Sequence, residues 1–207
     1  SDHSYGFRPG RGTQDAVSQS LSYLRSGYEY VVVIDIANYF GSVNHDQLMT
    51  RLSKDCQDKV FLKLIRKYLG SGVMINGVKH ATTEGTPQGG NLSPVLSNLF
   101  LDYLDKELER RGHHFVRYAD DISIYVKSAR AGERVLSSIS EWIEKRLKLA
   151  VNQDKSGVFK YTRTNLFGFG FYKDADGIQL RISKPSLRRF REKLRYFTKR
   201  FRSCCYD

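Results

Sequence analysis

The sequence predicts an α+β fold in which an antiparallel sheet is backed by helices. Apolar runs on both sides of Tyr118–Asp121 have the pattern of two strands joined by a tight turn. The β-branched run Tyr30–Ile34 has the pattern of a fully buried strand. Segments of helical period alternate with these strands in mixed order, which is typical of α+β proteins. The 207 residues, 40% hydrophobic and 27% charged, suffice for one domain or for one domain with an appendage.

Charge and composition restrict the class of partner. The net charge is +12 and the isoelectric point is about 9.6, so we expect an anionic partner, most commonly nucleic acid. Nine basic residues and a single acid lie between Lys184 and Arg202. No apolar stretch has the length of a membrane span, and the polar N-terminus lacks a signal-peptide pattern. The three cysteines have neither zinc nor disulfide spacing, so we expect a cytoplasmic protein without a membrane partner.

Caps and helical spacing predict the elements of the first half. Thr13 is expected to cap a first helix, and Asn44 with Gln47 has the pattern of a capping box for a second. A third helix is expected to end at Gly70. Its inner, apolar face is expected to hold five residues: Val60, Phe61, Leu64, Ile65 and Tyr68. Asn76-Gly77 between two apolar runs predicts a two-residue hairpin.

The second half is predicted in the same way. Ser93 is expected to cap a long helix with Pro94 in its first turn. The inner face of this helix is expected to hold Val95, Leu96, Leu99, Phe100, Tyr103 and Leu104. After the hairpin comes a helix with Val135, Leu136, Ile139, Trp142, Ile143 and Leu147 inward. Strands are expected near residues 158–159, 167–172 and 178–182. A basic helix with a buried aromatic face is expected to follow from residue 184.

Three aspartates stand at predicted strand ends. Asp120 and Asp121 lie at the hairpin turn, and Asp35 follows directly after the buried strand. A single Asp-Asp pair is most often a solvated turn, but a third carboxylate in a matching position favours a metal site. Two strands that present three carboxylates can hold two Mg²⁺ ions about 3.5–4 Å apart, the arrangement used for phosphoryl transfer.

Four motifs then occur in order: Tyr5–Gly12, Asp35 with Phe40, Thr86–Pro94 and Tyr118–Asp121. Each motif alone has low specificity, but four in this order at compatible spacing are very specific. The series resembles that of reverse transcriptases. The Gly-Phe-Arg-Pro-Gly-Arg opening and the Gln-Gly-Gly-Asn-Leu-Ser-Pro form narrow the resemblance to the bacterial group II intron-encoded reverse transcriptase/maturase. The resemblance extends from Tyr5 to about residue 200.

The resemblance implies a right-hand polymerase fold within one reverse transcriptase domain. It assigns residues 1–28 and 44–92 to partial fingers, 29–43 and 93–183 to the palm, and 184–207 to the start of the thumb. Further fingers segments and most of the thumb have no counterpart here. We therefore expect a core fragment of a longer protein from the bacterial cytoplasm, with weak or no polymerase activity on its own.

The resemblance also implies roles for the acids. Asp35, Asp120 and Asp121 are expected to bind two Mg²⁺ ions, for which Mn²⁺ is expected to substitute, and the carbonyl of Ile36 completes the ligand shell. One ion lowers the pKa of the primer 3′-hydroxyl, and the other neutralises the triphosphate and the leaving pyrophosphate. Lys155 is expected near the pyrophosphate as a general acid.

Further residues are expected to contact the substrates. Phe40, rather than its neighbour Tyr39, is expected under the incoming sugar, where its ring excludes a 2′-hydroxyl. The residues expected beside the nascent base pair are Pro87, Gln88, Gly89 and Gly90. The arginines expected on nucleic-acid phosphates are Arg8, Arg11, Arg188, Arg189, Arg191 and Arg195.

The function implied is an RNA-directed DNA polymerase that extends a primer 3′-hydroxyl. Its expected partners are an RNA template, a DNA primer, deoxynucleoside triphosphates and group II intron RNA, with roles in splicing and retrohoming. One alternative is an RNA-binding maturase, a splicing cofactor with little polymerase activity. Another alternative is a retron, diversity-generating or CRISPR-associated reverse transcriptase, which the opening motif disfavours.

Overall fold

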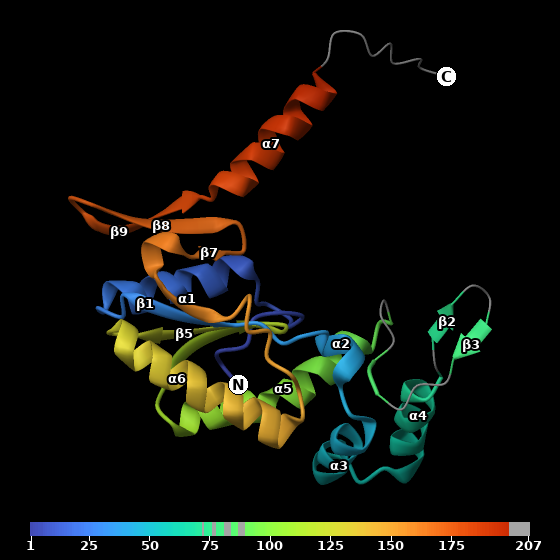
Figure 1. The fold of residues 1–207 in the computed structure, drawn as a ribbon. Coiled ribbons are helices and arrows are strands. Elements are labelled where there is room, and N and C mark those ends of the chain that lie inside the picture. The colour runs from blue at the N-terminus through green and yellow to red at the C-terminus, as the bar shows by residue number, and fades with distance from the viewer. Residues whose placement is uncertain (72, 76–77, 81–83, 87–89, 199–207) are drawn as a thin grey trace, which may run out of the picture.

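A four-stranded antiparallel sheet in the order β4-β5-β1-β6 forms the centre of the protein (Figure 1). The structure is a computed structural model that describes residues 1–71, 73–75, 78–80, 84–86 and 90–198. The central strands are β1 (Tyr30–Ile34), β4 (His114–Tyr118), β5 (Asp121–Val126) and β6 (Gly157–Lys160). The register pairs Val32 of β1 with Ile124 of β5 and with Val158 of β6, so β1 is an inner strand.

Helices cover one face of this sheet, below it in Figure 1. They are α5 (Ser93–Arg110), α6 (Ala129–Trp142) and the π-helical η1 (Ile143–Leu147), which continues α6. Phe100, Leu104 and Ile139 from these helices are buried in one core with Val32 and Ile124 from the strands. Burial of this apolar surface is the main force that holds helices and sheet together.

A second layer covers the opposite face. It consists of α1 (Thr13–Arg25), η2 (Tyr161–Arg163), β7 (Asn165–Leu166), β8 (Phe169–Asp174) and β9 (Gly177–Ile182). Tyr23 and Phe171 from this layer share a core with Val31 and Tyr125. Val31 and Val32 therefore serve opposite cores, as the alternation of side chains along a strand requires. The predicted α+β fold, an antiparallel sheet backed by helices, is confirmed.

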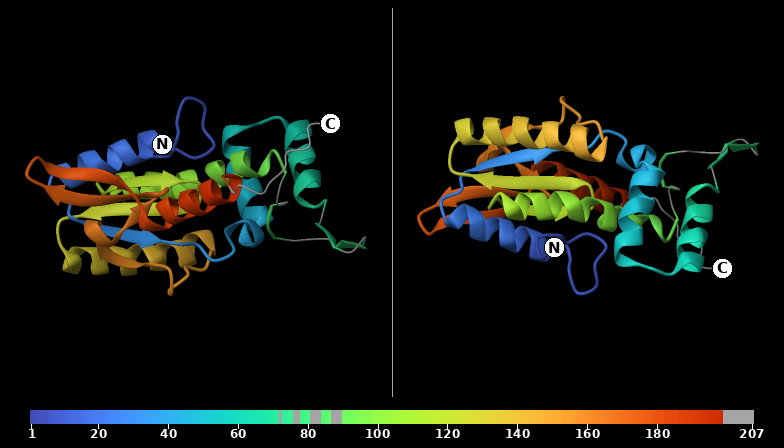
Figure 2. Two further views of the ribbon diagram at one scale, coloured as in Figure 1. Left: turned by 90° about the horizontal axis from the view of Figure 1, so that it is seen from above. Right: turned by 90° about the horizontal axis from the view of Figure 1, so that it is seen from below.

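The remaining elements lie at the periphery. They are α2 (Tyr39–Ser42), α3 (His45–Asp55), α4 (Lys59–Leu69), β2 (Val73–Ile75), β3 (Val78–His80) and α7 (Lys184–Phe197). The helices α2, α3 and α4 lie together beyond one end of the sheet in both views of Figure 2. The predicted hairpin is confirmed, because Ile75 pairs with Val78, although its turn lies outside the described residues.

Two predicted helix caps are wrong by one residue. Gly12 precedes the first helical residue of α1, so Thr13 lies inside the helix, and the Asp15 side chain accepts a hydrogen bond of 2.7 Å from Gly12 N. Leu92 likewise precedes α5, so Ser93 is already helical. At Asn44 the cap forms, because its side chain accepts a hydrogen bond from Gln47 N, but the predicted capping box is incomplete, since Gln47 Oε1 has no hydrogen-bond partner among the described residues.

Several residues predicted to face inward are exposed. On α4, Ile65 is buried, whereas Val60, Phe61 and Leu64 are exposed, Val60 by 80%. On α5, two residues of the predicted inner face are exposed: Val95 and Leu99. The helical periods were predicted correctly, but the apolar stripe on each helix is wider than the surface that the described residues pack against it.

The last segments also differ from the predictions. The strand expected over residues 167–172 is interrupted, because Phe167 and Gly168 both have positive φ angles and form the turn between β7 and β8. The helix α7 forms as expected, yet none of its residues is buried, and Phe190 and Phe197 are 62% and 72% exposed. The prediction that α7 buries an aromatic face is therefore wrong, since the helix points away from the sheet (Figure 1).

The assignment of residues 1–28 to the fingers stays a prediction. In the structure, α1 of this segment contacts β4 of the central sheet and β9 of the second layer. None of the helices in the described part of the chain has both the length and the apolarity needed to cross a membrane.

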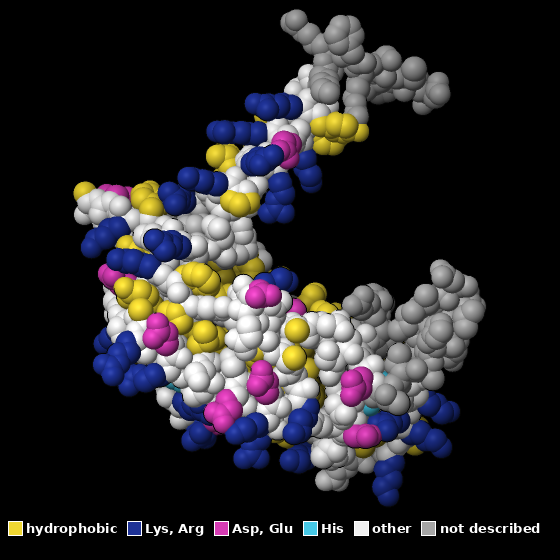
Figure 3. All heavy atoms as spheres, viewed as in Figure 1, with side chains coloured by type: hydrophobic (Ala, Val, Ile, Leu, Met, Phe, Trp, Pro, Cys, Tyr) yellow, Lys and Arg dark blue, Asp and Glu magenta, His cyan; other side chains and the backbone are white. Residues whose placement is uncertain are grey.

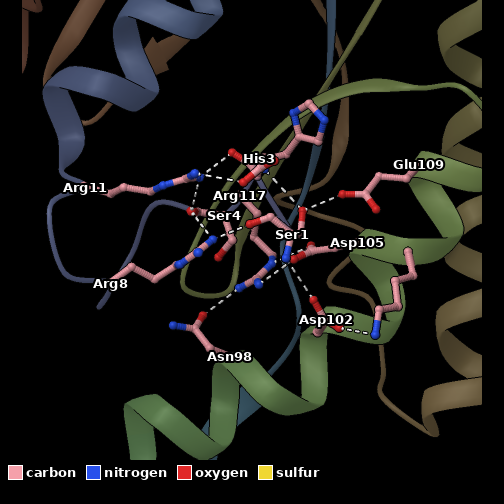
Figure 4. Close-up of polar contacts among 12 residues, drawn as sticks. Ser1, His3, Ser4, Arg8, Arg11, Asn98, Asp102, Asp105, Glu109 and Arg117 are labelled. Carbon is pink, nitrogen blue, oxygen red and sulfur yellow. Dashed lines mark hydrogen bonds and ion pairs between the residues drawn. The ribbon is translucent and has the colours of Figure 1, made fainter.

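A buried ion pair joins α5 to β4 (Figure 4). Arg117 is 1% exposed and Asp105 is fully buried. The Nε and Nη2 atoms of Arg117 each donate a hydrogen bond of 2.7 Å to a different carboxylate oxygen of Asp105. Nη1 donates to Asn98 Oδ1 at 2.9 Å and to the carbonyl of Ala119 at 2.8 Å. Burial raises the pKa of Asp105, while the hydrogen bonds and charge of Arg117 oppose that rise.

We predict that Asp105→Asn lowers the free energy of unfolding by about 3–5 kcal/mol, because the Arg117 charge is then buried without a counter-charge. Urea unfolding monitored by circular dichroism measures this loss. Glu109→Gln is the matched control, since Glu109 is exposed on the same helix, and it should cost little. Equal losses in the two variants would contradict the central role of the ion pair.

Candidate active site

The turn between β4 and β5 carries two of the three predicted aspartates. The predicted tight turn is present: Tyr118 pairs with Asp121, so Ala119 and Asp120 form a two-residue turn, whereas Asp121, predicted to lie at the turn, is the first residue of β5. Ala119 has a φ of 57°, a left-handed conformation that is uncommon for a residue with a side chain. The hydrogen bond from Arg117 to the Ala119 carbonyl holds this conformation from within the protein.

The third aspartate lies beside this turn. Ile34, the last residue of β1, pairs with Ile122, so Asp35 leaves the sheet next to Asp121 on the neighbouring strand. The chain thus brings Asp35, Asp120 and Asp121 together at the same end of the neighbouring strands β1 and β5, as the sequence predicted.

A loop after η1 lies alongside Asp35. Its backbone pairs with the chain around Asp35, because Asn152 N donates to the Asp35 carbonyl at 2.9 Å. The Ser156 hydroxyl accepts a hydrogen bond of 3.0 Å from Asp35 N. These contacts place Lys155 beside the acids, with its Nζ 3.9 Å from Asp35 Oδ2. The side chain of Lys155 remains mostly exposed, so it is free to contact a ligand.

The charges of the three acids act on one another. Asp121 is exposed at the surface, but neighbouring atoms shield its carboxyl in part; this partial burial raises the pKa of Asp121, and the negative charges of Asp120 and Asp35 raise it further. The positive charge of Lys155 lowers the same pKa and so opposes part of this effect. The carboxylates therefore form a site where added positive charge is favourable.

The donor set fits a hard divalent cation. Carboxylate oxygens are the ligands that Mg²⁺ prefers, and the repulsion at Asp121 would be relieved by such an ion. Among the residues that the structure describes, no three His, Cys, Asp or Glu side chains are already arranged to hold a metal. As they lie in this structure, the aspartate side chains therefore do not form a closed set of ligands.

The first residue predicted to contact the nucleotide, Phe40, lies shortly after the end of β1. Phe40 is partly exposed on α2, whereas Tyr39 is buried and its hydroxyl donates to the Ser97 carbonyl at 3.1 Å. The Phe40 carbonyl accepts a hydrogen bond of 2.6 Å from Thr86 N, which links α2 to the Thr86–Pro94 motif. Gly90 is described and partly buried. The predicted contacts Pro87, Gln88 and Gly89 lie outside the described residues.

The loop before α1 braces the aspartate turn. A Cβ atom added at Gly6 would lie 2.5 Å from Ala119 N, so only glycine allows this approach. Asn98 of α5 donates a hydrogen bond of 2.8 Å to the Gly6 carbonyl. The predicted phosphate contacts Arg8 and Arg11 both donate to backbone carbonyls of residues 1–4, which ties down the start of the chain (Figure 4).

The arginines predicted to contact nucleic acid on α7 are exposed. Figure 3 shows Lys and Arg side chains along α7, beside a hollow between this helix and the rest of the molecule. The four residues in question are Arg188, Arg189, Arg191 and Arg195. Arg188 forms an ion pair of 2.9 Å with Glu192, its neighbour on the helix.

Sequence reasoning missed the polar network behind the turn. Arg117 follows two apolar residues in β4. Its charge favours an exposed position on the strand, but in the structure it is buried. One signal was available: Asp105 falls at helical spacing between buried Leu101 and Leu108, where an acid needs a partner. The approach of Gly6 to Ala119 has no such signal, because it joins segments far apart in the chain.

Known proteins are similar to this chain in sequence and in fold. Residues 1–171 match the model of the family described as reverse transcriptase (RNA-dependent DNA polymerase). Group II intron-encoded protein LtrA of Lactococcus lactis subsp. cremoris is 29% identical over 214 residues, which cover 95% of this chain and 34% of LtrA. Protein YkfC of Escherichia coli (strain K12) is 30% identical over 193 residues, which cover 75% of this chain and 51% of YkfC. Other relatives come from Saccharomyces cerevisiae and Marchantia polymorpha.

The chain spans about a third of the length of LtrA and about half of YkfC. The telomerase of Candida tropicalis, truncated from its C-terminal domain, has a similar fold with a TM-score of 0.64 and 10% sequence identity. This likeness covers 88% of the present chain and 41% of that telomerase, and it confirms the predicted fold class. Since the family model covers most of the chain, the chain belongs to the reverse transcriptase (RNA-dependent DNA polymerase) family.

Proposed function

We propose that this chain is the polymerase core of a group II intron-encoded protein that, at full length, copies RNA into DNA. One observation carries the proposal: Asp35 directly follows β1, Asp121 begins the neighbouring strand β5, and Asp120 lies in the adjoining turn. Carboxylates at this density, with the pKa of Asp121 raised by partial burial and then by the other two acids, suit the binding of the divalent ions that nucleotidyl transfer requires. The similarity to LtrA supports the assignment to an intron-encoded protein.

The proposed partners are an RNA template, a DNA primer, deoxynucleoside triphosphates and group II intron RNA. The net charge of +12 supports anionic partners of this kind. A bacterial cytoplasmic location is also a proposal, because the relatives come from bacteria and from eukaryotes. The division of the chain into fingers, palm and thumb is likewise a proposal.

In the proposed reaction, Asp35, Asp120 and Asp121 hold two Mg²⁺ ions, with the Ile36 carbonyl as a further ligand. The ions, when bound, stabilise negative charge on the attacking 3′-oxygen and on the departing pyrophosphate. The contact of Lys155 with Asp35 supports a role for this ammonium group beside the pyrophosphate, to which it donates a proton as the pyrophosphate leaves.

Phe40 is proposed to select the sugar. The partly exposed ring follows Asp35 by five residues, and its backbone is fixed by the hydrogen bond from Thr86 N. A ring beneath the incoming sugar leaves no room for a 2′-hydroxyl, so ribonucleotides are excluded by collision. The proposed nucleic-acid contacts are Arg8, Arg11, Arg188, Arg189, Arg191 and Arg195. Among these, the exposure of the α7 arginines supports contact with a duplex backbone.

We predict that Asp120→Asn in the full-length protein lowers primer extension on an RNA template at least about a hundredfold, since loss of a metal ligand removes several kcal/mol of transition-state stabilisation. Extension of a labelled primer in Mg²⁺ measures this rate. RNA affinity, measured by filter binding, should be unchanged. Unaltered extension would overturn the role of Asp120, and unaltered splicing with lost extension would separate polymerase from maturase function.

We predict that Phe40→Ala raises the incorporation of ribonucleotides relative to deoxyribonucleotides by about ten- to a hundredfold, because the collision with the 2′-hydroxyl is removed. Single-nucleotide extension with each substrate measures the ratio of kcat/KM values. Tyr39→Phe is the control, since the Tyr39 side chain is buried away from solvent, and its ratio should match that of the wild type. A larger change in the control would reassign the selecting residue.

We predict that Asp121→Asn raises the melting temperature without divalent ions at pH 7 only slightly, by about 1 °C, because Asp121 is exposed and solvent screens the repulsion. The pKa of Asp121 is raised in the folded protein, so its ionised form costs stability above that pKa. The cost vanishes below the ordinary pKa of aspartate, about 4, so the two proteins should melt alike there.

Addition of Mg²⁺ or Mn²⁺ at pH 7 should raise the melting temperature of the wild type more than that of Asp121→Asn, because only the wild type has the full ligand set. Asp154→Asn, an exposed acid in the neighbouring loop, serves as the control and should respond like the wild type. An equal ion response in all three proteins would remove the case for a metal site at Asp121.

A further inference from the structure

A second candidate site lies on the helical side of the sheet, apart from the three aspartates. A cavity of about 600 Å³ opens between α3, α5 and the end of α6 with η1. In Figure 1, α5 and α6 lie below the sheet and α3 lies beyond its end, whereas α7 rises above the sheet. None of the residues that line this cavity belongs to the proposed polymerase site.

The acids that line the cavity are already neutralised from outside it. Asp46 forms an ion pair of 2.6 Å with Arg66. Glu107 accepts hydrogen bonds from Arg110 and Arg111, and those from Arg110 contribute most to lowering the pKa of Glu107 to about 2. Neither acid is therefore left to balance the positive charges of the cavity.

Three positive side chains line the cavity: Arg51, Lys54 and Arg146. Within the described residues, none of them forms an ion pair with a carboxylate. Arg51 is instead held by a hydrogen bond of 3.0 Å to the Phe100 carbonyl. The cavity therefore has an excess of positive charge that favours an anionic ligand.

Aromatic rings form part of the same wall. The Arg51 guanidinium lies 3.9 Å from the ring centroid of Tyr103 and 4.4 Å from that of Phe100, which fixes its position. Lys54 Nζ lies 6.0 Å from the Tyr103 ring. Trp142, which is partly exposed, lines the cavity at the end of α6. A ligand with both a flat ring and a negative charge matches this combination.

We propose that this cavity binds one unstacked nucleotide of an RNA strand. The base stacks on the aromatic wall at Trp142, and the phosphate pairs with Arg146 and Lys54. A base stacked on an aromatic side chain contributes about 1–3 kcal/mol, and arginine is the preferred partner of phosphate. Binding in this cavity needs neither Mg²⁺ nor the aspartates. The cavity would therefore be an RNA-binding site that acts independently of polymerisation.

Trp142 reports directly on this cavity, because it is the only tryptophan of the 207-residue chain. Titration of the chain with the trinucleotide ApApA in EDTA should quench its fluorescence to saturation. Arg146→Gln should weaken the dissociation constant about five- to tenfold, since a charged hydrogen bond to phosphate is lost. Arg134→Gln removes the same charge from an exposed site on α6 outside the cavity, and it should bind like the wild type.

Competition identifies the part of the ligand that is recognised. AMP should displace ApApA, whereas adenosine and inorganic phosphate should each displace it at least tenfold more weakly. Displacement by phosphate as strong as that by AMP would make the cavity a simple anion site and overturn the proposal. Absent or unsaturable quenching, or equal weakening in both arginine variants, would overturn it as well.

Asp120→Asn separates this proposal from the polymerase function. The variant should bind ApApA with the affinity of the wild type, because Asp120 is not in the cavity. A tenfold change in that affinity would show that the quenching reports on the aspartate site and would overturn the inference. The melting temperature of each variant, measured by circular dichroism, excludes unfolding as the cause of any loss.

Discussion

The arrangement of the aspartates depends on one buried cation. Arg117 is held by two oxygens of Asp105, and its remaining hydrogen bonds go to Asn98 and to the carbonyl of Ala119. Its backbone also pairs with the start of the chain, through the carbonyl of His3 and the amide of Tyr5. Helix, strand, first loop and aspartate turn are therefore joined at a single residue. A buried charge tolerates few alternative geometries, because each unpaired hydrogen-bonding group would be costly.

This rigidity allows a repulsive group to persist in the folded protein. Partial burial and the charges of Asp120 and Asp35 disfavour the ionised form of Asp121 and raise its pKa. Free side chains would relieve such repulsion by moving apart. Here the paired strands β1 and β5, together with the fixed turn, keep the backbone positions close. The stability lost at the acids is compensated by packing in the two cores on either side of the sheet.

Local patterns in the sequence were sufficient for much of this site. The strand before Asp35 and the hairpin around Asp120 follow from apolar runs and a tight turn, and the register then places Asp35 beside Asp121. Contacts between distant segments could not be predicted in this way. The burial of Arg117 depends on Asp105 in another element, and the approach of Gly6 depends on the shape of the turn at Ala119. The exposure of Val60 and Phe190 likewise could not be predicted from helical spacing. The spacing identifies the apolar face of a helix, but not whether another element packs against that face.

The attachment of α7 has a mechanical consequence. The Ser183 side chain caps the helix, and Ser183 N donates a hydrogen bond of 2.9 Å to the Gly168 carbonyl at the β7–β8 turn. No residue of the helix is buried, so its base determines its direction. A helix of 14 residues is about 21 Å long, and a tilt of about 10° at the base would move its tip by about 4 Å. Small rearrangements at Gly168 are thereby amplified, as by a lever, into large displacements of the basic side chains at the far end.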